Sequence, residues 1–191
     1  MDLHQTDKEL MQELISKRLY LRTLTEQDAT SRYANWLNNP TVNRFLEVRH
    51  AQHDIETCRS FIRTCNADPG CFLLGIFADH GKTHIGNIKL GPIDRRYGSG
   101  QISLFIGEPS YWGAGYATEA ISAITRFAFA ELGLSRLEAG CYEDNLGSLR
   151  AFLKSGFSLE GFFRKKFTLD GKRTGCFWLG ALKDERTDNY L

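Results

Sequence analysis

The sequence predicts one mixed α/β domain built around a single central sheet. The chain has 191 residues, a length typical of one domain. Apolar residues make up 42% and charged residues 25%, as in folded globular proteins. Segments in which apolar residues alternate with period two are interleaved with segments in which they recur every three or four residues. Strands and helices should therefore alternate along the chain, with helices flanking the sheet.

No internal repeat or linker divides the sequence, so one domain is expected. The predicted parts are a polar lead-in that is loose or helical (1–17), the domain itself (18–183) and a short tail (184–191).

In the first third of the chain, a short strand is expected at 20–24. Thr25–Asp28 has the pattern of a capping box and should open a helix. The apolar face of that helix would consist of Ala29, Tyr33, Trp36 and Leu37. Pro40 should end it, because proline cannot continue a helix. Residues 41–53 are expected to be irregular.

The remaining elements follow the same periodicities. A helix from about residue 54 is indicated by apolar residues spaced 3, 4 and 3 apart, namely Ile55, Cys58, Ile62 and Cys65. Further helices are expected at 116–132 and 145–155. Further strands are expected at 71–78, 83–90, 101–106, 136–142, 159–167 and 176–182, the last two as an antiparallel pair turning at 170–172.

The charge of the chain is nearly balanced, which argues against nucleic acid or an anionic membrane as a partner. Lys and Arg number 24, Asp and Glu number 23, and the formal net charge is +1. No uncharged run approaches the roughly 18 residues that a membrane-spanning helix needs. The first ten residues carry charges of both signs, unlike a secretory signal peptide. We expect a cytoplasmic protein.

The five cysteines are expected to be buried, reduced thiols. Their number is odd, none has Cys-x-x-Cys spacing, and most lie in apolar runs. No Cys/His set has the paired spacing of a zinc site, so no metal is expected.

The most informative stretch is Trp112-Gly113-Ala114-Gly115, which lies between a predicted strand and a long helix. The first amides of a helix lack internal partners, and the helix dipole adds positive charge there. Glycine lets the backbone turn tightly and lets a ligand approach those amides. A pyrophosphate suits such a helix end. A tight helix entry without any ligand is the alternative interpretation.

Two well-known phosphate motifs do not fit this stretch. A Walker loop needs Lys after the last glycine, where this chain has Tyr116. A dinucleotide fingerprint needs Gly or Ala three residues after the second glycine, where this chain has Thr118.

A second motif follows the next strand, where Asn145 should begin a helix. Parallel strands that diverge at this point would leave backbone amides and carbonyls free. A linear molecule that bears amides, such as pantetheine, could pair with them.

Together these motifs resemble the GNAT superfamily of acetyl-CoA-dependent N-acetyltransferases. The matching segments are Trp112-Gly113-Ala114-Gly115-Tyr116-Ala117-Thr118-Glu119-Ala120 and Asn145-x-x-Ser148-x-x-x-x-x-Lys154-x-Gly156-Phe157. The branch that contains ribosomal-protein alanine and serine N-acetyltransferases is the most similar. The resemblance implies a mixed central sheet that is splayed between the fourth and fifth strands and flanked by helices. It also implies acetyl-CoA as co-substrate.

Residue by residue, the resemblance implies a binding site for acetyl-CoA. The pyrophosphate would be held by the amides of Trp112, Gly113, Ala114, Gly115, Tyr116 and Ala117. The backbone of Phe105 and Ile106 would pair with pantetheine, and Asn145 and Ser148 would bind near its amide. On the helix after Asn145, Arg150 and Lys154 are the candidates for a phosphate.

The chain departs from the family pattern at two positions. Ser110 stands where Gln or Arg usually begins the loop. Phe152 stands where many members have a tyrosine that protonates the leaving thiolate. The similar branch often lacks this tyrosine too, so activity is not excluded.

Glu108 is the first candidate for the base that deprotonates the amine, because it ends the strand that would hold the thioester. The acceptor pocket is expected to involve Phe45, Glu47, His50 and Tyr111, with His53 as a further titratable group. Solvated or packing roles are the alternatives for each of these residues.

The sequence therefore predicts transfer of acetyl from acetyl-CoA to a primary amine. The acceptor would be a protein N-terminus, an amino sugar or a small amine, and the protein a monomer or homodimer. Two rival predictions are a non-catalytic acetyl-CoA-binding module on the same fold and a nucleotide-binding oxidoreductase.

Overall fold

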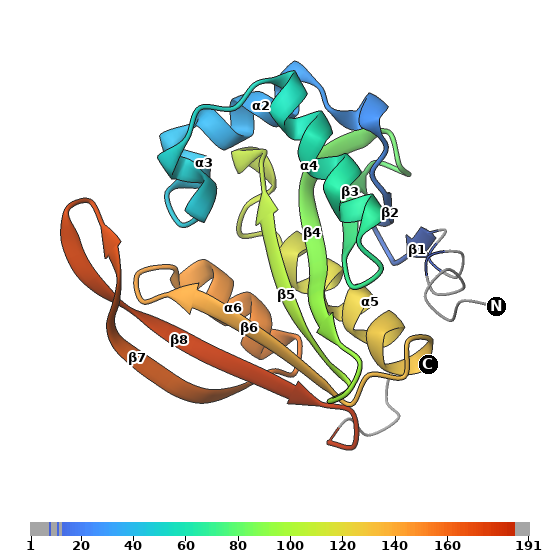
Figure 1. Cartoon of the computed structure of the whole chain (residues 1–191), viewed down its shortest axis with the longest axis vertical. Helices are drawn as coiled ribbons and strands as arrows, with labels where there is room; N and C mark the ends of the chain where they lie inside the picture. The colour runs from blue at the N-terminus through green and yellow to red at the C-terminus, as the bar shows by residue number, and fades with distance from the viewer. Residues whose placement is uncertain (1–7, 9–10, 12, 186–191) are drawn as a thin grey trace.

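An eight-stranded mixed sheet forms the centre of the computed structural model, which describes residues 8, 11 and 13–185 (Figure 1). The strands are β1 (Glu13–Ile15), β2 (Tyr20–Thr23), β3 (Phe72–Ala78), β4 (Thr83–Asp94), β5 (Ser99–Ile106), β6 (Arg136–Tyr142), β7 (Ser158–Leu169) and β8 (Lys172–Leu182). Their order across the sheet is β1-β2-β3-β4-β5-β6-β8-β7. β5 and β6 run parallel, and every other neighbouring pair is antiparallel.

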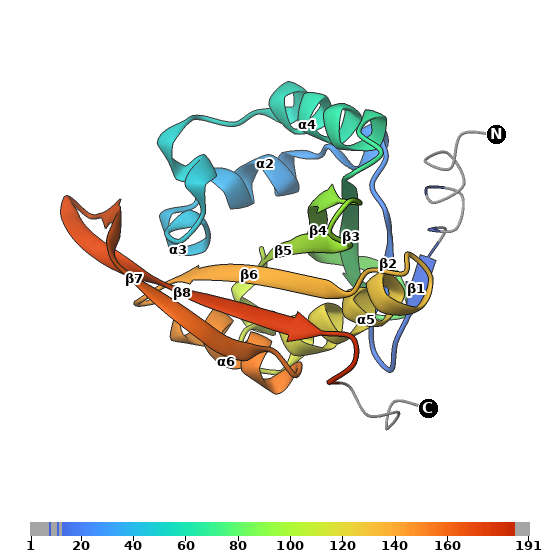
Figure 2. The ribbon, with the colours of Figure 1, turned by 60° about the horizontal axis from the view of Figure 1, so that its bottom comes forward.

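Helices cover both faces of this sheet. They are α2 (Ser31–Asn38), α3 (Pro40–Asn43), α4 (Ile55–Ala67), α5 (Tyr116–Ala130) and α6 (Leu146–Lys154), with 3-10 turns η1 (Glu26–Asp28), η2 (Glu47–His50) and η3 (Pro109–Tyr111). In Figure 2, α2, α3 and α4 lie above one face of the sheet, and α5 and α6 lie against the other. The mixed α/β fold predicted from the sequence is confirmed.

The core has two parts, one on each side of the sheet. The larger part packs α5 against the central strands, with Ile88, Ile102 and Ile124 fully buried. The second part packs α2 and α4 against β3. All seven residues of β3 are buried, which confirms the strand covered on both faces that its continuous apolar run predicts.

The predicted divergence of the fourth and fifth expected strands is confirmed. These strands are β5 and β6, which pair only at Ser99–Arg136, Gly100–Leu137 and Gln101–Glu138. Beyond Gln101, β5 continues to pair with β4 on its other edge, and β6 continues to pair with β8. The facing edges of β5 and β6 are therefore left without a strand partner between them.

The region before α4 differs from the prediction. The Thr25–Asp28 capping box forms, since the Asp28 carboxylate accepts from the Thr25 amide and hydroxyl. It opens only the 3-10 turn η1, however, and the helix begins afresh after Thr30, whose hydroxyl caps α2. The segment 41–53, expected to be irregular, contains most of α3 and all of η2.

The N-terminal lead-in also differs, where it is described. Residues 13–15 form β1 rather than a loose or helical segment, and Leu14 packs against the core. Other parts of the predicted lead-in and tail, at 1–7, 9, 10, 12 and 186–191, lie outside the described residues.

The last two strands form the predicted hairpin, with its turn at Asp170 and Gly171. Both strands are longer than expected. β7 carries register shifts between Leu159 and Gly161 and between Phe163 and Phe167, and these bulges break the period-two pattern by which a strand is recognised.

All five cysteines are buried free thiols, as predicted. Within residues 8, 11 and 13–185, no helix combines the length and apolarity needed to cross a membrane.

Candidate active site

The end of β5 leads directly into the glycine turn, which we define as Trp112–Gly115. The amides of Gly107 and Glu108 both donate to the carbonyl oxygen of Ile85, at 2.7 and 3.3 Å. The Trp112 indole donates to the Ile106 carbonyl oxygen at 2.8 Å. These bonds fold the chain back at the point where β5 and β6 have separated.

Both glycines of the turn are in the left-handed region. Gly113 has φ of 73° and Gly115 has φ of 85°, and Gly115 is the N-cap of α5. Residues other than glycine rarely adopt these backbone angles. A Cβ built on Gly113 would meet no atom within 4 Å, so this part of the turn is open to a ligand.

Six consecutive amides are unpaired at this helix end. Among the described residues, the amides from Gly113 to Thr118 donate to no backbone or side-chain acceptor, and the first bond back into the turn is from Glu119 to the Gly115 carbonyl oxygen at 3.0 Å. An open glycine turn with unpaired amides at the N-terminus of a 15-residue helix is chemically suited to a pyrophosphate.

Arg18 secures the glycine turn from outside its own sequence. Its guanidinium donates to the Ala114 carbonyl oxygen at 3.0 Å, pairs with Glu119 at 2.8 Å and lies 4.2 Å from the centroid of the Tyr116 ring. Sequence reasoning missed Arg18, because its partners lie about a hundred positions away and no local pattern marks it.

Glu119 is the carboxylate that pairs with Arg18. Burial alone would raise the pKa of Glu119, but hydrogen bonds from Ser16 and Arg18 outweigh burial and lower it. The carboxylate therefore stays ionised beside the first turn of α5 and holds Arg18 in place.

The second motif begins α6 as predicted. Asn145 caps the helix, since its Oδ1 accepts from the Ser148 amide at 3.2 Å. At the other end of α6, the Ser155 hydroxyl donates to the Thr118 carbonyl oxygen at 3.1 Å. This bond joins the end of α6 to the first turn of α5. The exposed Lys154 directly precedes Ser155 in the chain.

Phe152 belongs to the core. It is 2% exposed and packs edge-on against Phe157, with ring centroids 5.1 Å apart. The position at which the family resemblance led us to expect a tyrosine therefore carries a buried ring without a hydroxyl.

Glu108 lies two residues after the end of β5, with its carboxylate held by α2. Its Oε1 accepts from the Trp36 indole at 3.2 Å and lies 3.7 Å from Nε of Arg32. Trp36 packs so closely on Gly107 that a Cβ there would lie 2.1 Å from the ring. The chain therefore needs glycine at 107 to place Trp36 against Glu108.

A second cluster of side chains, both polar and aromatic, lies at the end of β6. We call it the Tyr142 cluster, and it consists of Phe45, Glu47, Arg49, Tyr142 and Phe167. The Tyr142 hydroxyl donates to the Glu47 carboxylate, and Nη2 of Arg49 donates to the same hydroxyl at 2.8 Å. The rings of Phe167 and Phe45 lie 4.7 and 6.0 Å from that of Tyr142.

Burial and the hydrogen bond to Glu47 raise the pKa of Tyr142, so its phenol remains protonated near neutral pH. Arg49 also donates to the Thr168 carbonyl oxygen at 3.0 Å, which ties η2 to β7. Sequence reasoning identified Phe45 and Glu47 but missed Tyr142 and Arg49. In the sequence, Tyr142 has the pattern of an ordinary strand residue. Its hydrogen bonds to Glu47 and Arg49 become evident only in the structure, at the end of β6 where the strands have diverged.

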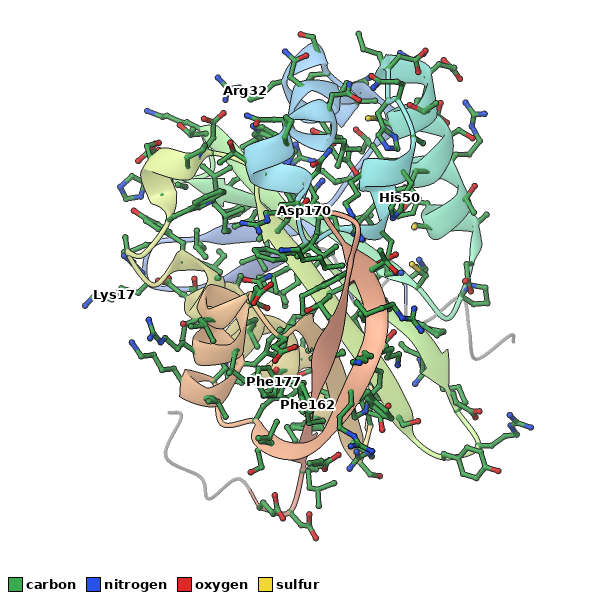
Figure 3. All side chains as sticks on the ribbon, turned by 90° about the vertical axis from the view of Figure 1, so that its left-hand side faces the viewer. Lys17, Arg32, His50, Phe162, Asp170 and Phe177 are labelled. Atoms are coloured by element: carbon green, nitrogen blue, oxygen red, sulfur yellow. The ribbon has the colours of Figure 1, made fainter. Side chains whose placement is uncertain are left out.

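The other predicted acceptor residues are dispersed. His50 lines an open pocket of about 480 Å³ together with Asp170 of the hairpin tip, and Figure 3 shows the tip beside the segment that carries His50. Tyr111 instead belongs with the glycine turn: its hydroxyl donates to Asp79 at 3.1 Å and its ring contacts Tyr116. His53 bonds to the Val48 carbonyl oxygen at 2.8 Å and braces its own loop.

Comparison with known proteins identifies the family of this chain. A family described as the acetyltransferase (GNAT) domain matches residues 18–158. The chain belongs to the GNAT family. An uncharacterized N-acetyltransferase of Bacillus subtilis (strain 168), YoaA, is 33% identical over 161 residues, which cover 83% of this chain and 89% of YoaA.

Solved GNAT structures share the fold. An acetyltransferase of the GNAT family from Bacillus anthracis is 21% identical and superposes with a TM-score of 0.77, over 90% of this chain and 99% of that one. The spermidine N-acetyltransferase of Vibrio cholerae, solved with CoA and spermine, is 18% identical with a TM-score of 0.77, over 88% and 98% of the two chains. At these identities the likeness concerns the fold alone.

Proposed function

We propose that this GNAT protein transfers acetyl from acetyl-CoA to a primary amine by direct attack of the amine on the thioester. The observation that carries the proposal is the run of unpaired amides from Gly113 to Thr118, placed where β5 and β6 diverge. Anion-binding amides and unpaired strand edges are the two features that a diphosphate joined to an amide-bearing chain requires.

Acetyl-CoA supplies the reactive thioester, and the residues present fit it. The amides of the glycine turn and of the first turn of α5 bind the pyrophosphate, and Lys154 adds a positive charge nearby. The backbone of Phe105 and Ile106 pairs with pantetheine along the free edge of β5. Asn145 has its Oδ1 in the helix cap and offers its amide nitrogen as a donor, and Ser148 lies one turn into α6.

The acceptor amine enters between the two diverging strands. A carboxylate stands at each side: Glu108 follows β5, and Glu47 is bonded to the last residue of β6. Only a neutral amine is nucleophilic, and an alkyl ammonium has a pKa of about 10.4. A carboxylate within reach, directly or through one water, assists loss of that proton.

A panel of amines tests the proposal. The purified chain is given acetyl-CoA with a peptide that has a free N-terminal alanine, an amino sugar or a small alkyl amine, and release of free CoA thiol is measured. Thiol release that depends on the amine is expected for at least one class. Absence of release with every class would contradict the proposal.

One observation favours a second candidate, a non-catalytic module that binds acetyl-CoA. Phe152 is buried and has no hydroxyl to protonate a leaving thiolate. Tight binding of acetyl-CoA without turnover would identify such a module. Thermal stabilisation by NAD(P) and none by CoA would instead indicate an oxidoreductase.

We further propose a single domain over 18–183, a monomeric or homodimeric state and a cytoplasmic location.

A further inference from the structure

Three aromatic rings surround the ammonium group of Lys166 on the β7–β8 hairpin. Its Nζ lies 4.3 Å from the ring centroid of Phe163, 5.1 Å from that of Trp178 and 5.6 Å from that of Phe167. All three distances fall within the roughly 6 Å over which a cation is attracted to an aromatic face. We call these three rings the ring cage.

The geometry of the cage is built into the hairpin. The rings of Phe163 and Trp178 are nearly perpendicular, at 84°, with centroids 5.9 Å apart. Trp178 lies close over Gly140, where a Cβ would be 2.8 Å from the indole. Any larger residue at 140 would displace the indole that forms one wall.

A bulge in β7 directs Lys166 at the rings. Phe163 pairs with Cys176 and Phe167 with Thr174, so three residues of β7 oppose one residue of β8. Within this bulge, Lys165 has φ of 52°, an angle that is uncommon outside glycine. Bulges of this kind redirect side chains.

The rings are the contacts that Lys166 makes. Among the described residues it has no carboxylate within ion-pair distance. Lys166 is exposed, as are its neighbours Arg164 and Lys165. Phe163 is 47% exposed, so the cage opens to solvent. An external cation can therefore reach the rings if Lys166 swings away.

The cage adjoins the candidate active site. Phe167, one of its walls, stacks on Tyr142 at 4.7 Å, and Tyr142 is the last residue of β6 and is bonded to Glu47. Trp178 is the register partner of Gly140, two residues before Tyr142. The cage thus lies beside the acceptor side of the divergence.

We propose that the ring cage binds an alkylammonium group of the acceptor, and that Lys166 competes with it for the rings. This inference rests on the proposed function. The amine that reacts must be neutral, so the group in the cage is a second cation on the same acceptor. The acceptor class is therefore a diamine, a polyamine or a peptide with a basic side chain near its reacting amine.

The site itself is tested with tetramethylammonium, a cation that has no N–H to acetylate, against tert-butanol, a neutral molecule of similar shape. Binding is followed by NMR on the Trp178 indole N–H signal, which is assigned by its loss in Trp178→Phe. Saturable shifts with the cation and none with the alcohol are expected. Equal shifts with both would overturn a cation site.

Paired variants test the competition. Lys166→Met should tighten tetramethylammonium binding by about threefold or more, and Phe163→Leu should weaken it by about fivefold, the range expected for one cation–ring contact. Lys165→Met and Phe162→Leu are the controls. Phe162 is exposed to a similar extent, at 42%, but packs on Phe177, beside which it lies in Figure 3. Lys166→Met binding no more tightly than Lys165→Met would overturn the proposal.

The link to the acceptor is tested by comparing 1,5-diaminopentane with pentylamine as acetyl acceptors. Lys166→Met should lower KM for the diamine and leave KM for the monoamine unchanged. An equal change for both amines would overturn the acceptor role of the cage. Absence of turnover with both amines would exclude small alkyl amines as acceptors and so overturn the diamine role of the cage, while the tetramethylammonium titration would still decide whether the cage binds a cation.

Discussion

Arg18 donates from Nη1 to the carbonyl oxygen of Ala114 at 3.0 Å, across 96 positions of sequence. The same guanidinium pairs with Glu119 and stacks on Tyr116. One side chain therefore fixes the backbone of the glycine turn and the first turn of α5 relative to each other. Arg18 is also the first residue of the segment that matches the GNAT family.

Arg18→Met should weaken acetyl-CoA binding by about tenfold, equivalent to about 1.4 kcal/mol. Methionine keeps part of the apolar stem but removes the bonds to Ala114 and Glu119, so the unpaired amides lose their fixed orientation. Isothermal titration measures the affinity. Lys17→Met, which removes a positive charge at the preceding residue, is the control. Equal affinities for the two variants would show that Arg18 does not position the turn.

Gly113→Ala should reduce acetyl-CoA affinity by about tenfold or more, because a methyl group would stand where the ligand approaches the amides. Gly133 is a matched control, since it has φ of 66° against 73° at Gly113, and an added Cβ meets no atom within 4 Å at either site. Each alanine should cost about 1 kcal/mol of stability from left-handed strain. If Gly133→Ala weakens binding equally, strain rather than ligand approach explains the loss.

Glu119→Gln should destabilise the protein at pH 7 and progressively less as the pH falls. The folded state lowers the pKa of Glu119 below its ordinary value of 4.5. A carboxyl group with a lowered pKa contributes stability above its unfolded pKa, and that stability is lost as the pH falls through the folded pKa. Thermal unfolding from pH 7 to pH 3 measures the convergence. Exposed Glu131, at the far end of α5, provides the control Glu131→Gln, whose Tm should follow the wild type throughout.

The sequence predicted those parts of the fold whose signals are local. Apolar periodicity located α4, α5 and β3, and the glycine turn and Asn145 marked two helix starts that face one gap. The divergence of β5 and β6 was reached through a family resemblance, since no property of either strand alone encodes how far the pairing extends.

The parts that could not be predicted depend on contacts between distant residues. Arg18 and Tyr142 carry no local pattern, and each acquires its role only when the sheet brings its partners to it. The helix start at Thr30 was missed because Thr25–Asp28 is a real capping box that caps only a 3-10 turn. Most of the twelve-residue β7 was predicted, but its bulges were not, and the rings around Lys166 were therefore not foreseen.

Glu108 and Glu47 are rival bases, and their amide variants distinguish them. The variant of the true base, Glu108→Gln or Glu47→Gln, should lower kcat by about 100-fold at pH values below the pKa of the acceptor amine. Above that pKa the amine arrives neutral and needs no base, so the rates of variant and wild type should converge. Because Glu108 is held by Trp36, Trp36→Phe should produce a weaker form of the Glu108→Gln pH profile if Glu108 is the base. If Glu47 is the base, Tyr142→Phe should do so instead, since it removes the hydroxyl that bonds to Glu47. Profiles of kcat against pH that match the wild type for both amide variants would exclude both carboxylates and leave deprotonation to solvent.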